Sequence, residues 1–530
     1  MSIILRNTAV PGMLCIFPCT LRIGSWLTFV LDLLLIVFPV VLTLTLFSDH
    51  ILLLLLAQTI TLLTFVVVLI CDQCFMKRRK RTYCDLFHQI NDDHYSPTKF
   101  VTYMRLYGFL ATAGAILSVD FDVFPRRFAK TSIFGRSVMD LGTATFVYCF
   151  AVVDVFRHYP GRVKHVTQKQ WYCSLKPSSS AVLIMLGIAR TFLLHFTNYQ
   201  YQISEYGIYW NFFITLGLLR FLVDFLGRRY HLLLGIIIAF TYQYFLTKQN
   251  LQEYLISNET KRKDFVSKNR EGIFSFFGYL SIYYLASAIA NFLFTATSHQ
   301  EYCDPNMNCS VTERRKRIKV WFYRSFQLLL LTVVIFLAQE FAIKLVGPPS
   351  RRIANVPYIL EMMSTLELFM NETFQVVFHN IYLCSYLFVQ LLQSWASQIS
   401  GFHNKLNKKA NTAENGRMEM HSETKIVLGD DENPLEVLKP FLVDSINEQG
   451  LLFFLLANIL TGLVNKSINT SSVKNHYHAT AIITVYMCSC VTLVHLFTRL
   501  QKKVNCKSAL CGIIFFRNKN SLLCPSISLP

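Results

Sequence analysis

Residues 23–47 read IGSWLTFVLDLLLIVFPVVLTLTLF, and residues 51–71 read ILLLLLAQTITLLTFVVVLIC. Each run is as long as the roughly 20 apolar residues that an α-helix needs to cross a bilayer. Backbone amides and carbonyls in lipid have no water to bind, so they must form hydrogen bonds within the helix. The two runs therefore predict membrane-spanning helices.

The composition indicates the same class for the whole chain. Hydrophobic residues make up 53% of the 530 positions and charged residues only 16%, which leaves too little polar surface for a soluble protein. We predict an all-α, polytopic integral membrane protein. Similar apolar runs recur at about residues 100–119, 137–156, 180–197, 208–226, 231–247, 273–297, 320–346 and 478–498.

Two regions are harder to assign. Residues 357–395 are long enough for two helices, but glutamates interrupt the first half, so we expect the first helix to face protein rather than lipid. The apolar run 451–464 is short for a span unless it begins before Gly450. Counting both regions, the sequence predicts about twelve or thirteen transmembrane helices.

The chain is expected to form a single multi-span domain over residues 1–530, and it has no internal repeat. Residues 401–435 are polar and carry charges of both signs, which is typical of a linker. Residues 504–530 form a tail that is too short and interrupted to span again. The N-terminal apolar stretch has no small-residue cleavage site before the first long run, so we expect a retained anchor.

The net charge of +19 is unevenly distributed. Most basic clusters fall on one side of the predicted spans, which the positive-inside rule makes cytoplasmic. These clusters lie at residues 77–81, 157–169, 228–229 and 314–317. The loop after Asp120 and the loops 202–205, 248–272 and 347–356 then face the lumen.

Three of these lumenal loops nevertheless carry arginines. Arg126 and Arg127 lie in the first, Arg270 in the second, and Arg351 and Arg352 in the third. One explanation is that the charge rule is only statistical. The other is a site for anionic ligands, since guanidinium groups bind phosphate in a bidentate manner. The sequence contains no soluble basic domain, so nucleic acid is not an expected partner.

A carboxylate and a lysine flank a rigid, basic turn at one of these membrane edges. The sequence from Ser118 to Lys130 is SVDFDVFPRRFAK, and MDLG follows at residues 139–142. Charge at a membrane edge is energetically expensive and is therefore usually functional. The signature resembles that of the PIG-W family and its fungal counterparts, the GWT family. That family acylates the inositol of glucosaminyl-phosphatidylinositol during GPI-anchor synthesis.

Further blocks in matching order extend the resemblance over most of the chain. They are GIAR at 187–190, EYGIYWNFF at 205–213, NREGI at 269–273, SRRIAN at 350–355, LLAN at 455–458 and TGLVN at 461–465. The resemblance implies acyl-CoA as co-substrate, no cofactor, glucosaminyl-phosphatidylinositol as acceptor and a location in the endoplasmic reticulum membrane. Asp122 departs from the pattern, because many relatives have Pro there.

The resemblance also assigns Asp120 and Lys130 as the catalytic pair. A hydroxyl that attacks a thioester needs a base, and the tetrahedral oxyanion needs a positive group or donors to stabilise it. Asp120 and Lys130 suit these two roles, and Pro125 bends the loop in a way that helps the two side chains to meet. The alternative is an ion pair that only fixes the loop.

The remaining motif residues are expected to bind substrate, although some also have a structural explanation. Asp140 near a helix start suits a cap, and asparagines can join membrane helices. Arg190 lies inside a span, where an arginine normally needs an anion or a polar cavity. The expected substrate-binding residues are Arg126, Arg127, Asp140, Arg190, Asn211, Asn269, Arg270, Glu271, Arg351, Arg352 and Asn458.

Three other classes of protein stay open. A polytopic transporter would show paired broken helices, which the sequence lacks. A non-catalytic scaffold of the GPI pathway would tolerate loss of Asp120. An acyltransferase of the MBOAT type would use a histidine in an apolar helix, for which His195 and His379 are candidates. No metal site is expected, because Cys71 and Cys74 have metal-ligand spacing but no second ligand pair.

Overall fold

The fold is that of a computed structural model, which describes residues 29–60 with short gaps, 98–158, 179–197, 203–257 without 228, 262–298, 311–376 and 441–515. Over these residues every regular element is helical and no strand is present. Four segments are long and apolar enough to cross a membrane: Arg270–Leu293, Phe326–Val346, Gly450–Ser467 and His476–Gln501. The predicted all-α polytopic membrane fold is confirmed.

The number of spans stays a prediction. Most of the apolar run 51–71 lies outside the described residues, as do residues 377–395, where a second helix is expected. The polar linker 401–435 lies outside them too. The run at 451–464 forms part of α19 (Gly450–Ser467), which begins at Gly450 and follows the short helix α18 (Phe441–Glu448).

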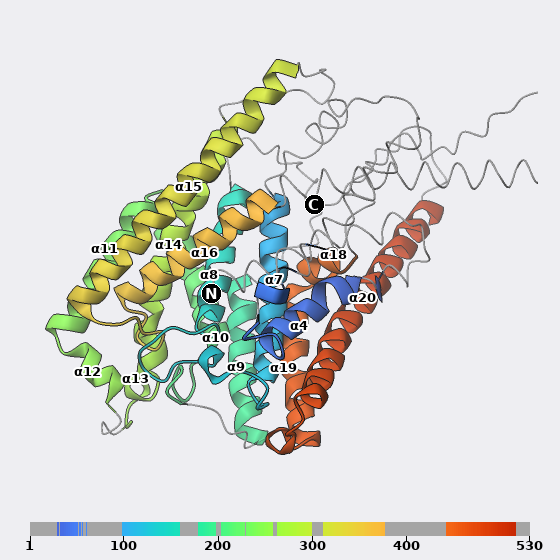
Figure 1. The fold of residues 1–530 in the computed structure, drawn as a ribbon, viewed down its shortest axis with the longest axis horizontal. Helices are drawn as coiled ribbons and strands as arrows, with labels where there is room; N and C mark the ends of the chain where they lie inside the picture. Colours follow the sequence, from blue (N-terminus) through green and yellow to red (C-terminus); the bar gives the residue numbers. More distant parts are fainter. Residues whose placement is uncertain are drawn as a thin grey trace, which may run out of the picture.

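Two helices, α7 (Thr98–Ser118) and α8 (Leu141–His158), run through the middle of the molecule (Figure 1). On one side α8 packs against α14 (Arg270–Ser298), which in turn packs against α11 (His231–Lys248). On the other side α7 packs against α18, α19, α20 (His476–Phe515) and α4 (Phe38–Leu44). The central pair therefore joins the two flanks of the fold.

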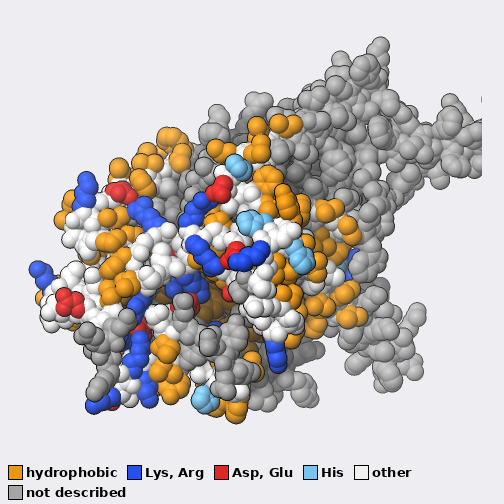
Figure 2. Space-filling view, turned by 60° about the horizontal axis from the view of Figure 1, so that its bottom comes forward, with side chains coloured by type: hydrophobic (Ala, Val, Ile, Leu, Met, Phe, Trp, Pro, Cys, Tyr) orange, Lys and Arg blue, Asp and Glu red, His pale blue; other side chains and the backbone are white. Residues whose placement is uncertain are grey.

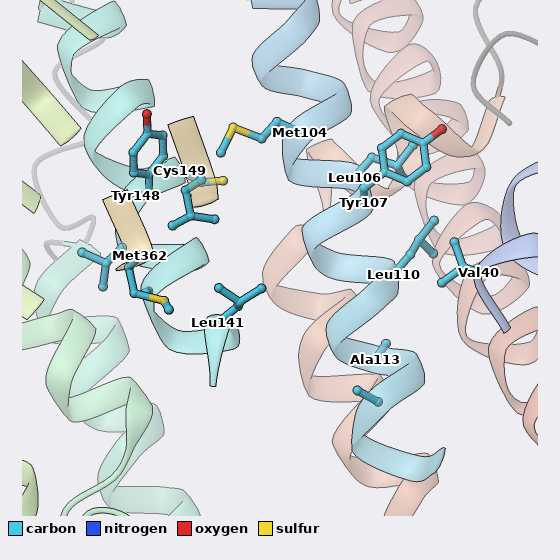
Figure 3. Packing of buried hydrophobic residues seen from close by; sticks show 14 of the residues in the cluster. Val40, Met104, Leu106, Tyr107, Leu110, Ala113, Leu141, Tyr148, Cys149 and Met362 are labelled. Carbon is cyan, nitrogen blue, oxygen red and sulfur yellow. The ribbon is translucent and has the colours of Figure 1, made fainter. Parts of the chain in front are cut away.

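The core between these helices is apolar and closely packed. From α7, the side chains of Met104, Leu110 and Ala113 are fully buried, and from α8 the ring of Tyr148 is too. Figure 3 shows this packing, with Val40 of α4 facing α7 from the opposite side. Burying such side chains stabilises the fold by about 1.5–3 kcal/mol for each large residue.

The outer helices differ from the inner ones in what they face. In α14 most residues of the span Arg270–Leu293 are buried, whereas in α15 (Val311–Val346) few residues of the span Phe326–Val346 are buried. A helix that is apolar all round and exposed on most sides is suited to contact lipid. The next helix, α16 (Val356–Val376), buries Met362 and Glu361 against protein, which confirms the prediction for the first helix of 357–395.

Helix ends differ from the predicted ones for local reasons. The predicted helix 208–226 begins only at Phe212, in α10 (Phe212–Leu226), because the Asn211 side chain caps it by accepting hydrogen bonds from the Phe213 and Ile214 amides. Before Pro39 a π-helical turn spans Leu33–Val37. This widened turn lies directly ahead of a proline that has no N–H to donate.

The last helix is longer than expected. The predicted span 478–498 lies within α20, which continues to Phe515. The tail that was expected from residue 504 is therefore helical over its first part. No Pro occurs between His476 and Phe515, so nothing local ends the helix earlier.

Candidate functional site

The connections at one end of the helices lie against one another. The 119–140 connection meets the 347–355 connection, where the Gly135 amide donates to the Pro349 carbonyl over 3.0 Å. The 203–211 connection meets the start of α14, where the Gly272 amide donates to the Tyr206 carbonyl over 3.0 Å. The predicted grouping of these loops on one side is confirmed, and Figure 2 shows charged side chains gathered around a hollow on this face.

Asp120 lies just beyond the end of α7, in the turn that begins the 119–140 connection. Its amide still donates to the Leu117 carbonyl, so the helix fixes the direction in which the chain leaves. The carboxylate is half-buried, and its Oδ2 accepts a hydrogen bond from Asn465 Nδ2 at 2.8 Å. Asn465 belongs to the last turn of α19, which packs against α7.

Lys130 follows the 3₁₀ turn Arg126–Phe128, which begins directly after Pro125. Its ammonium group contacts Glu205 Oε1 at 2.6 Å, and the two side chains are 38% and 21% exposed. Asp120 and Lys130 do not form an ion pair with each other in this structure. Each of the two predicted catalytic residues therefore has a different partner, Asn465 for Asp120 and Glu205 for Lys130.

Glu205 is part of a larger buried network. Arg351 places Nε 2.9 Å from Asp140 Oδ1 and Nη2 3.9 Å from Glu205 Oε1. Asp140 also accepts a hydrogen bond from Thr131 Oγ1 at 2.9 Å, and Thr131 is the neighbour of Lys130 in the chain. Lys130, Glu205, Arg351, Asp140 and Thr131 therefore form a closed ring, which we call the Lys130 ring.

Electrostatics within the Lys130 ring favour the charged form of Glu205. Burial alone would raise the pKa of the Glu205 carboxyl, but the charges of Lys130 and Arg351 outweigh it and lower the pKa. Arg190 on α9 (Ser179–Thr197) also lowers the pKa of Glu205, although its own side chain is exposed. At neutral pH Glu205 is therefore ionised.

A second cluster holds three of the basic side chains around one carboxylate. Glu271 is fully buried, and its Oε1 lies 2.6 Å from Arg262, 3.1 Å from Arg352 and 3.4 Å from Arg270. Arg352 also donates to the Leu255 carbonyl of the short helix α12 (Leu251–Ile256) over 3.1 Å. These contacts hold residues 262–269, including α13 (Phe265–Lys268), against the start of α14.

The two arginines nearest Asp120 are exposed at the rim. Arg126 donates to the Val119 carbonyl over 3.1 Å and lies 3.7 Å from Asp122. Arg127 contacts Asp49 at 2.5 Å. With side chains 66% and 55% exposed, both arginines are accessible to a ligand from solvent.

The predicted asparagines have structural contacts. Asn211 donates to the Gly187 carbonyl over 2.8 Å and so joins α10 to α9. Asn269 Oδ1 accepts hydrogen bonds from the Tyr209 and Trp210 amides. Asn458 donates to Phe454 within its own helix, over 2.7 Å.

Glu205 and Asn465 are the site residues that sequence reasoning missed. Both lie inside blocks that carry the family resemblance, but Glu205 is 75 positions from Lys130, and Asn465 is 345 positions from Asp120. Of the two alternative histidines, His195 is exposed on α9 and His379 lies outside the described residues. Cys71 and Cys74 lie outside them as well.

The family model described as GWT1 matches residues 2–497 of this sequence. The chain belongs to the GWT1 family. It is 29% identical over 411 residues to GPI-anchored wall transfer protein 1 of Candida albicans, covering 73% of each chain. The Aspergillus oryzae protein of that name is 30% identical over 399 residues, which cover 73% of this chain and 70% of that protein. The Saccharomyces cerevisiae protein is 28% identical over 421 residues, covering 75% and 73%. GWT1 membership confirms the resemblance found in the sequence.

Proposed function

We propose that this protein takes part in GPI-anchor biosynthesis as an inositol acyltransferase of the endoplasmic reticulum membrane. It transfers a long-chain fatty acyl group, with palmitoyl as the expected chain, from acyl-CoA to an inositol hydroxyl of glucosaminyl-phosphatidylinositol. The observation that carries the proposal is the family match over residues 2–497, which includes both Asp120 and Lys130. The face that holds these residues is proposed to be lumenal.

In this reaction the inositol hydroxyl oxygen attacks the thioester carbonyl carbon while its proton passes to Asp120. The new C–O bond forms, and negative charge develops on the former carbonyl oxygen. The Lys130 ammonium group stabilises that oxyanion as a positive group. When the tetrahedral intermediate collapses, the C–S bond breaks and the coenzyme A thiolate leaves, taking up a proton.

The geometry supports this division of roles. Asp120 is half-buried and its Oδ1 is not used by Asn465, so one carboxylate oxygen is left to act as base. Lys130 is held by Glu205 but remains 38% exposed, so its other protons can reach a ligand. Arg126 and Arg127, exposed beside the site, are proposed to bind phosphate groups of the substrates.

The test is acyl transfer from radiolabelled palmitoyl-CoA to glucosaminyl-phosphatidylinositol in microsomes from cells that lack their own enzyme. We expect wild-type protein to be active and both Asp120→Asn and Lys130→Ala to lose at least about 100-fold, the usual effect of removing an acid–base or oxyanion group. Lys474→Ala, an exposed change on the same face, is the matched control.

Protein amounts must be equal in all samples. Activity that persists in the two variants would move the catalytic groups elsewhere in the chain. A wild-type protein without activity would favour the transporter or scaffold alternative.

A further inference from the structure

The contact between Asp120 and Asn465 carries an inference about substrate recognition. The two residues come from different helices, α7 and α19, yet their side chains meet at 2.8 Å. An ionised carboxylate can only accept hydrogen bonds, so the Asn465 amide must turn its Nδ2 toward Asp120. Its Oδ1 then necessarily points to a different partner.

No residue in the described part of the chain provides that partner. Asn465 Oδ1 is buried and has no hydrogen-bond partner among the described residues. Buried polar atoms are paired in the great majority of cases, so an acceptor left over beside a proposed catalytic base needs an explanation. A hydroxyl donor on the substrate would supply one.

The charged groups near Asp120 do not compete for this role. On its own loop Arg126 lies 3.7 Å from Asp122, and from the 468–475 connection Lys474 lies 3.6 Å from Asp122 as well. Both cationic side chains contact Asp122, so Asn465 is the residue that contacts the Asp120 carboxylate. From α19 the exposed Lys466 points away from the buried side of the helix.

We propose that Asn465 is a positioning and specificity residue that works with Asp120 to recognise a vicinal diol. Its Nδ2 fixes the orientation of the Asp120 carboxylate, and its Oδ1 accepts a hydrogen bond from the hydroxyl next to the one that is acylated. The inference rests on the proposed function and adds that the protein recognises two adjacent hydroxyls of the acceptor. Inositol, a ring of adjacent hydroxyls, offers such a diol, and the pair would select which hydroxyl faces the thioester.

The first test measures kcat and KM for the acceptor for wild type, Asn465→Ala, Asn465→Asp and the control Lys466→Ala, an exposed position on the same helix. We expect Asn465→Ala to lower kcat about 10- to 100-fold, as for a lost bond to a charged group. Asn465→Asp keeps the side-chain shape but cannot donate a hydrogen bond to the Asp120 carboxylate, so it should lower kcat as well.

The second test uses an acceptor that lacks the hydroxyl next to the acylated one. Wild type should use this deoxy acceptor at least about tenfold less efficiently, because the missing hydroxyl leaves the Asn465 oxygen without a donor. Asn465→Ala should discriminate much less between the two acceptors. Such a coupling between variant and substrate change is the signature of a direct contact.

The outcomes separate the possibilities. Loss of activity in Asn465→Ala with unchanged discrimination between the two acceptors would make Asn465 purely structural and overturn the inference. Wild-type kinetics in both variants would overturn it too. A wild-type protein with no acyl transfer at all would overturn the proposed function together with the inference, whereas the other two results leave the proposed function intact.

Discussion

At the scale of single residues, Lys130 is the side chain whose surroundings differ most from expectation. The sequence suggests Asp120 as its partner, ten positions away, whereas its ammonium group contacts Glu205 at 2.6 Å. A lysine has three donor hydrogens, so Glu205 can fix its position while another hydrogen faces the substrate. Arg351, in turn, holds Glu205 from the other side.

Replacing Glu205 with Gln removes the charge but keeps the shape of the side chain. The pKa of Glu205 is lowered in the fold, so its ion pairs stabilise the protein above the ordinary value of 4.5 and are lost as the pH falls through the lowered pKa. We therefore expect Glu205→Gln to lower the thermal stability of the purified protein at about pH 7, and the difference from wild type to shrink as the pH falls below the ordinary value of 4.5.

The same variant should lower kcat about tenfold, because Lys130 loses the group that positions it. Glu205→Asp should recover part of the activity. Glu253→Gln, an exposed acidic residue of α12 on the same side of the molecule, is the control. Equal stability of wild type and Glu205→Gln at neutral pH would contradict this account of the ring.

At the scale of helices and connections, the sequence predicts the interiors of helices well and their contacts poorly. The predicted helix 231–247 is observed as His231–Lys248, since an unbroken apolar run has few alternatives in a membrane. By contrast, the partners Glu205 and Asn465 lie far along the chain from the residues that they hold. Tertiary packing brings these pairs together, and no periodicity in the sequence encodes it.

The connection that carries Glu205 depends on a close approach of two backbones. Gly207 has φ +109°, and a Cβ there would lie 2.5 Å from Asn269 Cα. We expect Gly207→Ala to destabilise the protein by about 1–3 kcal/mol and to lower activity by displacing Glu205. Gly462→Ala in α19, where a Cβ would meet nothing within 4 Å, should instead be neutral or stabilising. Thermal unfolding in detergent measures both, and a Gly207→Ala protein as stable as Gly462→Ala would refute the argument.

At the scale of the whole molecule, connections from distant parts of the sequence assemble one charged face. Charge counting along the chain predicts that the 119–140, 202–205, 248–272 and 347–356 loops share a side, and the structure brings them together. The positive-inside rule predicts that this side is lumenal, whereas the arginines on the face favour the cytosol. Glycosylation distinguishes the two orientations.

N-glycosylation reports which side of the membrane a loop faces, because the modification occurs only in the lumen. The sequon Asn258-Glu259-Thr260 lies in the sequence between α12 and α13, and Asn308-Cys309-Ser310 comes directly before α15 in the sequence. Both sequons lie outside the described residues, but α15 begins at Val311, at its end away from the 347–355 connection.

Three further sequons begin at Asn371, Asn465 and Asn469, so the test uses a background that carries Asn371→Gln, Ser467→Ala and Asn469→Gln. If the charged face is lumenal, glycosidase treatment should increase the mobility of this background protein and of its Asn308→Gln variant but not of its Asn258→Gln variant. A mobility change that disappears in Asn308→Gln instead would place the charged face, and with it Asp120 and Lys130, in the cytosol. Acyl-CoA made in the cytosol would then reach the site without crossing the membrane.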